Sequence, residues 1–297
     1  MGSTKAVENT LPQLLSGFSI YNQKSSFGNQ ILYDMCDQNK NPWGDPNRLA
    51  DKIWLIGRSY AASPERRYTD QLPLTAEEKK TINHGDGTGE YFYYIAQYLC
   101  NDMRLSQLAA QISTLLPLRF DGSKNDIEAL LKSIGYVALF NNMIKDASSD
   151  YEKHRNKLIH SKLFYRNQIS FCSKFLHFHA PHNIFIIDHF SQEGGRFLYS
   201  TQTRKSIKLK NCDIVIDKAI REAIHAYHPH LNISVKDIGV DVGEKAQKAV
   251  ECYISHCLYS YGFGYFLHNK MKLSPENSLC PFPRIVDSIF QNTTVTG

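Results

Sequence analysis

Asp188 stands directly behind four apolar residues, Ile184 to Ile187, in the string HNIFIIDHFS. A carboxylate at the end of such a run is costly to bury unless it has partners or a chemical task. It could stabilise a developing positive charge or orient a water molecule for attack. Asp is also a favoured N-cap residue, so a second interpretation is that Asp188 caps the helix that follows. Both interpretations stay open at this point.

A helix and a turn are predicted to position this acid. Phe171, Phe175 and Phe178 recur at helical spacing, which predicts a helix with one apolar side. Pro181 and Asn183 end that helix. The order is therefore helix, proline-marked turn, short apolar run and acid.

This order resembles the segment that carries the catalytic aspartate in the helix-hairpin-helix DNA glycosylases. The matching positions are Phe171 to His179, Pro181, Ile186-Ile187 and Asp188. The resemblance implies an all-α enzyme that flips a modified or mismatched base out of double-stranded DNA and hydrolyses its N-glycosidic bond. Asp188 is the catalytic residue that it implies, and it implies no metal or other cofactor.

The chain departs from this family at the hairpin. The family has closely spaced glycines before the helix, whereas residues 165–169 (YRNQI) contain none. The lysine of the bifunctional members would fall close to Ile169, and Lys174 lies inside the predicted helix. The resemblance therefore implies a divergent, monofunctional glycosylase, active in repair or in defence against modified foreign DNA.

The segment from Lys52 to Tyr68 is predicted to supply the wall of the base pocket. The apolar stripe of the predicted helix consists of Leu49, Ile53, Ile56 and Tyr60. Arg58 and Trp54 lie on the opposite side of this helix. A buried arginine needs an acidic, phosphate or aromatic partner, and an ion pair within the protein is the alternative interpretation. Under the glycosylase hypothesis the substrate-pocket residues are Trp54, Arg58, Tyr60 and His177.

A mild basic excess permits an anionic partner. The net charge is +5, and basic residues gather between Thr203 and Lys210 in a stretch without helical periodicity. This stretch is either a solvated loop or an arm that binds phosphates. The predicted nucleic-acid contacts are Arg66, Arg67, Lys174, Arg204, Lys205, Lys208 and Lys210.

The string RNKLIH, from Arg155 to His160, favours a different enzyme class. It resembles the active-site motif of the HEPN ribonucleases, which are all-α and dimerise. The resemblance implies metal-independent RNA cleavage, with His160 as acid or base and Arg155 stabilising negative charge. A basic surface turn is the structural alternative. A non-catalytic nucleic-acid-binding protein is the third hypothesis.

The histidines and cysteines do not have the spacing of a common metal site. His177 and His179 cannot share one helical face, and Cys252, His256 and Cys257 lack the spacing of a zinc knuckle. The seven cysteines contain no C-x-x-C pair, which is typical of free thiols in a reducing compartment. No apolar run approaches the length of a membrane span. These features predict a cytoplasmic protein without a membrane partner.

Helical periodicity extends over nearly the whole chain, which predicts an all-α protein. Residues 259–266 (YSYGFGYF) are interpreted either as a base-stacking surface or, more simply, as aromatic packing at a helix end. The sequence predicts one helical unit over residues 1–297, and two lobes (about 1–150 and 151–297) around a cleft are one arrangement of it. The predicted helices cover residues 49–60, 91–116 (one helix or a pair), 126–147, 171–179, 216–227 and 244–261. Residues 68–88 and 200–211 are predicted to be irregular, and 214–216 is the best candidate strand.

Overall fold

The structure, a computed structural model, describes residues 30–37, 43–59, 88–155, 168–199, 207–209, 215–216, 221–222, 224–225, 231–271, 281–291 and 293–295. Helices dominate these residues, which confirms the predicted all-α class. The strands are very short: β1 (Ile207–Leu209) pairs antiparallel with both β2 (Val215–Ile216) and β3 (Thr293–Val295). Strand β2 lies within the predicted candidate strand.

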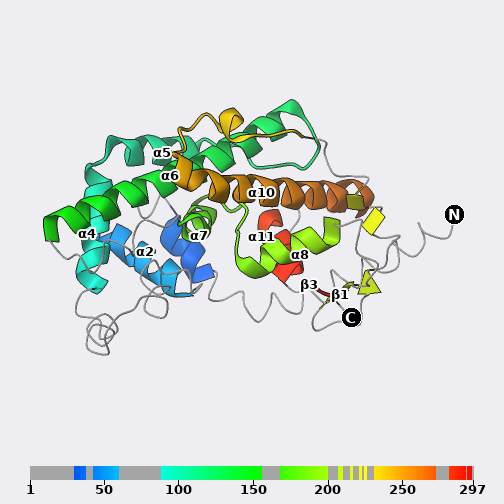
Figure 1. Cartoon of the computed structure of the whole chain (residues 1–297), viewed down its shortest axis with the longest axis horizontal. Helices are drawn as coiled ribbons and strands as arrows, with labels where there is room; N and C mark the ends of the chain where they lie inside the picture. Colours follow the sequence, from blue (N-terminus) through cyan, green and yellow to red (C-terminus); the bar gives the residue numbers. More distant parts are fainter. Residues whose placement is uncertain are drawn as a thin grey trace.

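Two long helices, α6 (Lys124–Arg155) and α10 (Glu244–Met271), extend across the molecule (Figure 1). The helix α7 (Ile169–His179) contacts both of them and also α2 (Pro46–Ser59). The other named elements are α4 (Thr88–Asn101), α5 (Met103–Ser113), α8 (His189–Tyr199), α11 (Phe282–Gln291) and the 3-10 helix η1 (Val235–Ile238). Residues 30–36, 221–222 and 224–225 are also helical. In the pairs α2–α4 and α8–α11 the helices pack directly on each other.

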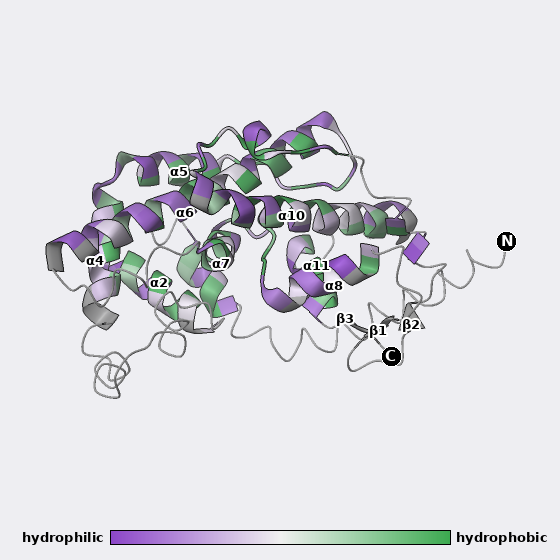
Figure 2. Cartoon of the chain, viewed as in Figure 1, coloured by the Kyte–Doolittle hydropathy of each residue, from purple (hydrophilic) through white to green (hydrophobic). Residues whose placement is uncertain are grey.

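One connected hydrophobic core joins residues of both halves of the chain. The two-lobed arrangement around a cleft is not visible in the described residues and stays a prediction. Coloured by hydropathy, α2, α6 and α10 change between hydrophilic and hydrophobic residues around their circumference (Figure 2), as expected of helices that bury one side. Among the described helices, none has the length and apolar character needed to span a bilayer.

The segment predicted as one helix or a pair is a pair. Asp102 separates α4 from α5, and its side chain accepts a hydrogen bond from the Arg104 backbone N–H at 2.9 Å, which caps α5. Helix α10 is longer than predicted because it continues through the aromatic string. Tyr261 and Phe263 of that string are buried in the core, so the aromatic-packing interpretation is confirmed and the base-stacking one is wrong for these two rings.

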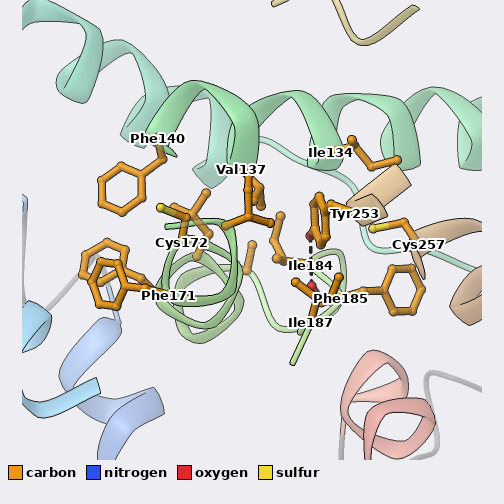
Figure 3. Close-up of a cluster of buried hydrophobic side chains, with 14 of the residues drawn as sticks. Ile134, Val137, Phe140, Phe171, Cys172, Ile184, Phe185, Ile187, Tyr253 and Cys257 are labelled. Carbon is orange, nitrogen blue, oxygen red and sulfur yellow. Dashed lines mark hydrogen bonds between the residues drawn. The ribbon is translucent and has the colours of Figure 1, made fainter. Parts of the chain in front are cut away.

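Helix α7 is buried on nearly every side. Phe171, Phe175 and Phe178 lie in the core as predicted, but Lys174 and His177 on the other side of the helix are buried as well. Figure 3 shows side chains of this helix beside those of α6 and α10. A helix in this position can hold a neighbouring segment firmly in place.

The neighbouring segment is the extended run of residues 184–187, which is buried. Its backbone polar groups must find partners, and side chains provide them. Three successive carbonyl groups accept hydrogen bonds from His177 Nδ1 (2.8 Å), Tyr253 OH (2.9 Å) and His256 Nε2 (2.7 Å). The Tyr253 bond is drawn in Figure 3. The N–H at the end of the run donates to Ser173 Oγ (3.2 Å). Helices α7 and α10 therefore fix the segment that leads to Asp188.

Candidate active site around Asp188

Asp188 caps α8 with one of its two carboxylate oxygens. Oδ1 accepts a hydrogen bond from the Ser191 backbone N–H at 2.8 Å. In return, the Asp188 backbone N–H donates to Ser191 Oγ at 3.0 Å. This reciprocal pair has the logic of a capping box. The capping interpretation is therefore correct for Oδ1, and the role of the other oxygen is a separate question.

The second oxygen of Asp188 faces two groups that capping does not need. Gln291 Nε2 donates a hydrogen bond to Oδ2 at 2.9 Å, and Lys174 Nζ lies 4.0 Å from the same oxygen. The Lys174 side chain is 3% exposed, whereas that of Asp188 is 19% exposed. A lysine is rarely buried to this extent without acidic partners. The Asp188 carboxylate is thus the more accessible member of a buried pair.

Helix α11 supplies the rest of this polar group. Arg284, Asp287 and Gln291 lie at positions i, i+3 and i+7 and share one face of the helix. Arg284 forms an ion pair with Asp287. Gln291 Nε2 also contacts both oxygens of Asp287 at 3.2 and 3.1 Å, so one amide group bridges two carboxylates. We refer to Lys174, Asp188, Ser191, Arg284, Asp287 and Gln291 as the Asp188 cluster.

Burial dominates the electrostatics of Asp287. It raises the pKa of this carboxyl from 3.8 to about 6. The guanidinium of Arg284 and the ammonium of Lys174 act in the opposite direction, while the charge of Asp188 raises the pKa further. The formal charges of the two acids, Asp188 and Asp287, equal those of the two bases, Lys174 and Arg284, within this cluster. A structural ion-pair network is the alternative interpretation of this arrangement.

Glycine allows α11 to come this close to Asp188. A Cβ atom added at Gly194 of α8 would lie 1.9 Å from the backbone oxygen of Phe290, and one at Gly195 would lie 3.0 Å from the Phe290 ring. The absence of side chains at these two positions lets the last turn of α11 rest on α8. That contact places Gln291, the next residue, beside the carboxylate.

His177 does not line an open pocket. It is completely buried, and both ring nitrogens have partners. Because Nδ1 donates to the Ile184 carbonyl, Nε2 of the neutral ring accepts a hydrogen bond from the Tyr33 hydroxyl at 2.9 Å. Burial lowers the pKa of His177 to about 3. The described structure gives this residue a structural position instead of the predicted contact with a base or phosphate.

The other predicted pocket residues are not brought to Asp188 by the described structure. Trp54 is 46% exposed on α2. Arg58 belongs to the same helix, but its side chain and the whole of Tyr60 lie outside the described residues. No described contact joins Trp54 to Asp188, so a pocket wall formed by α2 stays a prediction.

The predicted nucleic-acid contacts are placed only in part. Lys174 is buried beside Asp188, where a phosphate on the surface would not reach it. Lys208 belongs to β1, with its backbone opposite Val215 and Thr294, but its side chain is not described. The predicted contacts that lie outside the described residues are Arg66, Arg67, Arg204, Lys205 and Lys210.

The ribonuclease motif is also placed only in part. Arg155 is the last residue of α6, with its side chain not described, and His160 lies outside the described residues. Within the described part of the chain, no group of three or more His, Cys, Asp or Glu side chains is arranged to hold a metal ion. His256 instead donates to the backbone of the apolar run, and Cys257 is buried.

Sequence reasoning found Asp188 but missed its partners on α11. A signal for them exists in the string FPRIVDSIFQ. Arg284, Asp287, Ser288 and Gln291 recur at helical spacing within a strongly apolar helix, and a polar stripe in such a helix indicates a buried polar contact. The pattern does not say which element the stripe faces.

Comparison of the chain with protein-family models, with curated proteins and with solved structures found no match. Function must therefore be inferred from the residues and geometry of the chain itself.

Proposed function

We propose that this protein is a monofunctional DNA glycosylase that excises a modified base from double-stranded DNA, in repair or in defence against modified foreign DNA. The observation that carries the proposal is that the two carboxylate oxygens of Asp188 have different partners. One oxygen caps α8, while the other is held by Gln291 and Lys174 at the edge of a buried polar cluster and is not needed for the cap. The sequence resemblance to the catalytic segment of the helix-hairpin-helix glycosylases adds support.

The reaction requires a sheltered carboxylate beside the sugar of the flipped nucleotide. As the bond between C1′ and the base nitrogen breaks, its electron pair leaves with the base, which takes up a proton. Asp188 stabilises the positive charge that develops on the sugar. Water then adds its hydroxyl group to C1′, and its proton passes to Asp188. Asp188 releases this proton to the solvent, which replaces the solvent proton that the base took up. Partial exposure of this side chain (19%) allows the sugar to approach it.

The position of Lys174 supports hydrolysis without strand cleavage. Its Nζ donates to Ser170 Oγ at 3.1 Å, faces Asp188, and belongs to a side chain that is only 3% exposed. Strand cleavage by a glycosylase needs a lysine that presents an uncharged amine to the sugar and forms a Schiff base with it. The buried Lys174 amine instead faces Ser170 and Asp188, so it is not presented to the sugar. The product is therefore expected to be an abasic site, and the strand should break only after treatment with alkali or heat.

A cytoplasmic location is part of the proposal. The described cysteines are unpaired, and Cys36, Cys172 and Cys257 are buried, which is typical of a reducing compartment. The HEPN-like ribonuclease, using Arg155 and His160, and the non-catalytic nucleic-acid-binding protein stay as alternative hypotheses. No described contact favours either of them over the glycosylase.

The first prediction tests Asp188 as the catalytic residue. Asp188→Asn keeps an N-cap side chain of nearly equal quality, so the fold should persist. Loss of the negative charge should reduce base excision by about 100-fold or more. The measurement is strand breakage after alkali, on a panel of duplexes that each carry one modified base or mismatch. Asp237→Asn is the matched control, because Asp237 is an exposed carboxylate in the capping box of η1.

The outcomes separate the three hypotheses. Excision by wild-type protein that Asp188→Asn abolishes and Asp237→Asn preserves supports the glycosylase. Full excision activity in Asp188→Asn removes Asp188 from the mechanism. Direct RNA cleavage in the presence of a chelator, lost in His160→Ala, would instead favour the ribonuclease. Binding to nucleic acid without any cleavage would favour the non-catalytic protein.

A further inference from the structure

A groove of about 520 Å³ lies on α4, where this helix meets α6 and the start of α5. Helix α4 lies well apart from α8 and α11 (Figure 1), so the groove is separate from the Asp188 cluster. Four of its residues lie at positions i, i+3, i+4 and i+7 of α4 and share one face of the helix. The described lining residues are Tyr94, Gln97, Tyr98, Asn101, Asp102 and Asp150.

The charges at this groove are predominantly negative. Two of the described lining residues, Asp102 and Asp150, are acids, and none is a base. Asp146 is a third acid nearby. It shares the Arg104 guanidinium with Asp102, at 2.8 and 2.7 Å. The Arg104 guanidinium thus pairs with two of these three acids, and the three carboxylates together outnumber this one base. Burial and then the charges of Asp146, Asp150 and Asp102 raise the pKa of Tyr98, which agrees with a negative potential at its ring.

The uncharged lining residues complement these acids. Tyr94 donates a hydrogen bond to Asp150 Oδ2 at 2.6 Å, which fixes an aromatic ring beside a carboxylate. Gln97, Tyr98 and Asn101 form no side-chain hydrogen bonds with other described residues, so their polar groups can bind a ligand. Aromatic rings next to carboxylates are a common way to recognise organic cations, because the ring face and the acid both attract positive charge.

We propose that this groove binds the guanidinium or ammonium group of an arginine or lysine side chain presented by a partner protein. The groove is open to solvent, which suits a side chain that projects from another surface better than an enclosed metabolite. Its acidic lining repels DNA phosphates. A basic partner would therefore occupy a face that nucleic acid leaves free, and this inference does not depend on the proposed glycosylase activity.

A nuclear magnetic resonance titration with N-acetyl-argininamide tests the groove. The backbone amides of residues 94–102 should shift with a dissociation constant of about 1–10 mM, as expected for one charged side chain. The neutral N-acetyl-glutaminamide should cause no such shifts. A peptide of three arginines should bind more tightly than the single residue, and added salt should weaken both interactions.

Two variants remove the two kinds of contact. Tyr98→Leu removes a ring without breaking a hydrogen bond to another described residue, and Asp150→Asn removes one charge. Each should weaken binding by about three- to tenfold. Two matched controls should bind as wild type does. Tyr93→Leu changes an exposed ring of the same helix outside the groove, and Glu193→Gln removes an exposed acid of α8, which lies well apart from α4 (Figure 1).

Three results would overturn the proposal. One is the absence of shifts in residues 94–102 up to about 50 mM of the arginine probe, well above the expected constant. Another is equal weakening in the groove variants and in their controls, which would reduce the effect to overall charge or exposed aromatic area. The third is tighter binding of free spermidine than of the arginine peptide, which would assign the groove to a small polyamine and exclude the protein partner.

Discussion

Within the single residue Asp188, the two carboxylate oxygens have different partners. One oxygen stabilises the fold, and the other is available for the proposed reaction. Oδ1 holds the first turn of α8, while Oδ2 meets Gln291 and Lys174. Gln291 connects the two acids of the cluster because its amide nitrogen contacts the carboxylates of both Asp188 and Asp287. A neutral donor between two acids relieves a repulsion that would otherwise act across a buried space.

Replacing Gln291 should therefore affect the site according to the charge introduced. Gln291→Leu removes the bridging donor and should lower stability by about 1–2 kcal/mol. Gln291→Glu places a third acid beside two and should cost more, with the difference shrinking as pH falls below about 6, where Asp287 takes up a proton. Urea unfolding of both variants at pH 5 and pH 7.5 measures this. Equal stability of the two variants at pH 7.5 would show that Gln291 does not separate charges.

At the scale of helices, the position of α11 depends on the small residues of α8. Gly194 faces the backbone of Phe290 with no room for a methyl group, whereas a Cβ atom added at Gly44 would meet no atom within 4 Å. Helix–helix contact at backbone distance is what brings the polar stripe of α11 to Asp188.

Gly194→Ala should push α11 away from α8. We expect a loss of about 1–3 kcal/mol in the free energy of unfolding and, under the proposed function, a loss of excision activity beyond what stability explains. Gly44→Ala is the matched control and should change stability by less than about 0.5 kcal/mol. Thermal melts and the alkali-cleavage assay at a temperature where both variants are folded measure the two effects. A Gly194→Ala protein as stable as the control would contradict the close contact.

Much of the helical arrangement could be predicted from the sequence because apolar spacing reports which side of a helix is buried. The spacing of Phe171, Phe175 and Phe178 gave α7 and its core side correctly. The extension of α10 was missed because YSYGFGYF was interpreted as aromatic packing at a helix end, whereas the helix continues through this string to Met271. Gly264 within it is where the Phe120 ring packs, since a Cβ atom there would lie 2.5 Å from that ring. The meeting of α11 with Asp188 could not be predicted, because periodicity identifies faces and not their partners.

At the scale of the whole molecule, buried titratable groups make stability depend on pH. Burial lowers the pKa values of His177 and His179 to about 3 and that of His256 to about 4, from 6.5. Each of these groups contributes stability above pH 6.5 that is lost as pH falls toward its folded pKa. The contribution of Asp287 to stability has the opposite pH dependence. Its pKa in the folded state is raised to about 6, so as pH falls the folded protein takes up this proton before the unfolded protein does, and stability increases.

The histidines outnumber the acid, so acidification should destabilise the protein. Near pH 5, unfolding takes up about two protons from these four groups, which corresponds to a slope of about 3 kcal/mol per pH unit. Urea unfolding between pH 4.5 and 6.5 measures it. Asp287→Asn should steepen the loss, since it removes the group that opposes the histidines. Stability that is flat or that rises on acidification in wild-type protein would contradict neutral, buried histidines.

Helix α7, enclosed by α2, α6 and α10, also determines how the protein opens. Nearly all of its side chains are buried, so we expect the amide protons of its central turns to exchange only through global unfolding. Because its side chains hold the run that ends at Asp188, the site should persist until that event. On heating, any catalytic activity should therefore disappear together with the fold and not before it. Exchange protection in α7 equal to the global unfolding free energy would establish this coupling, and inactivation well below the melting temperature would refute it.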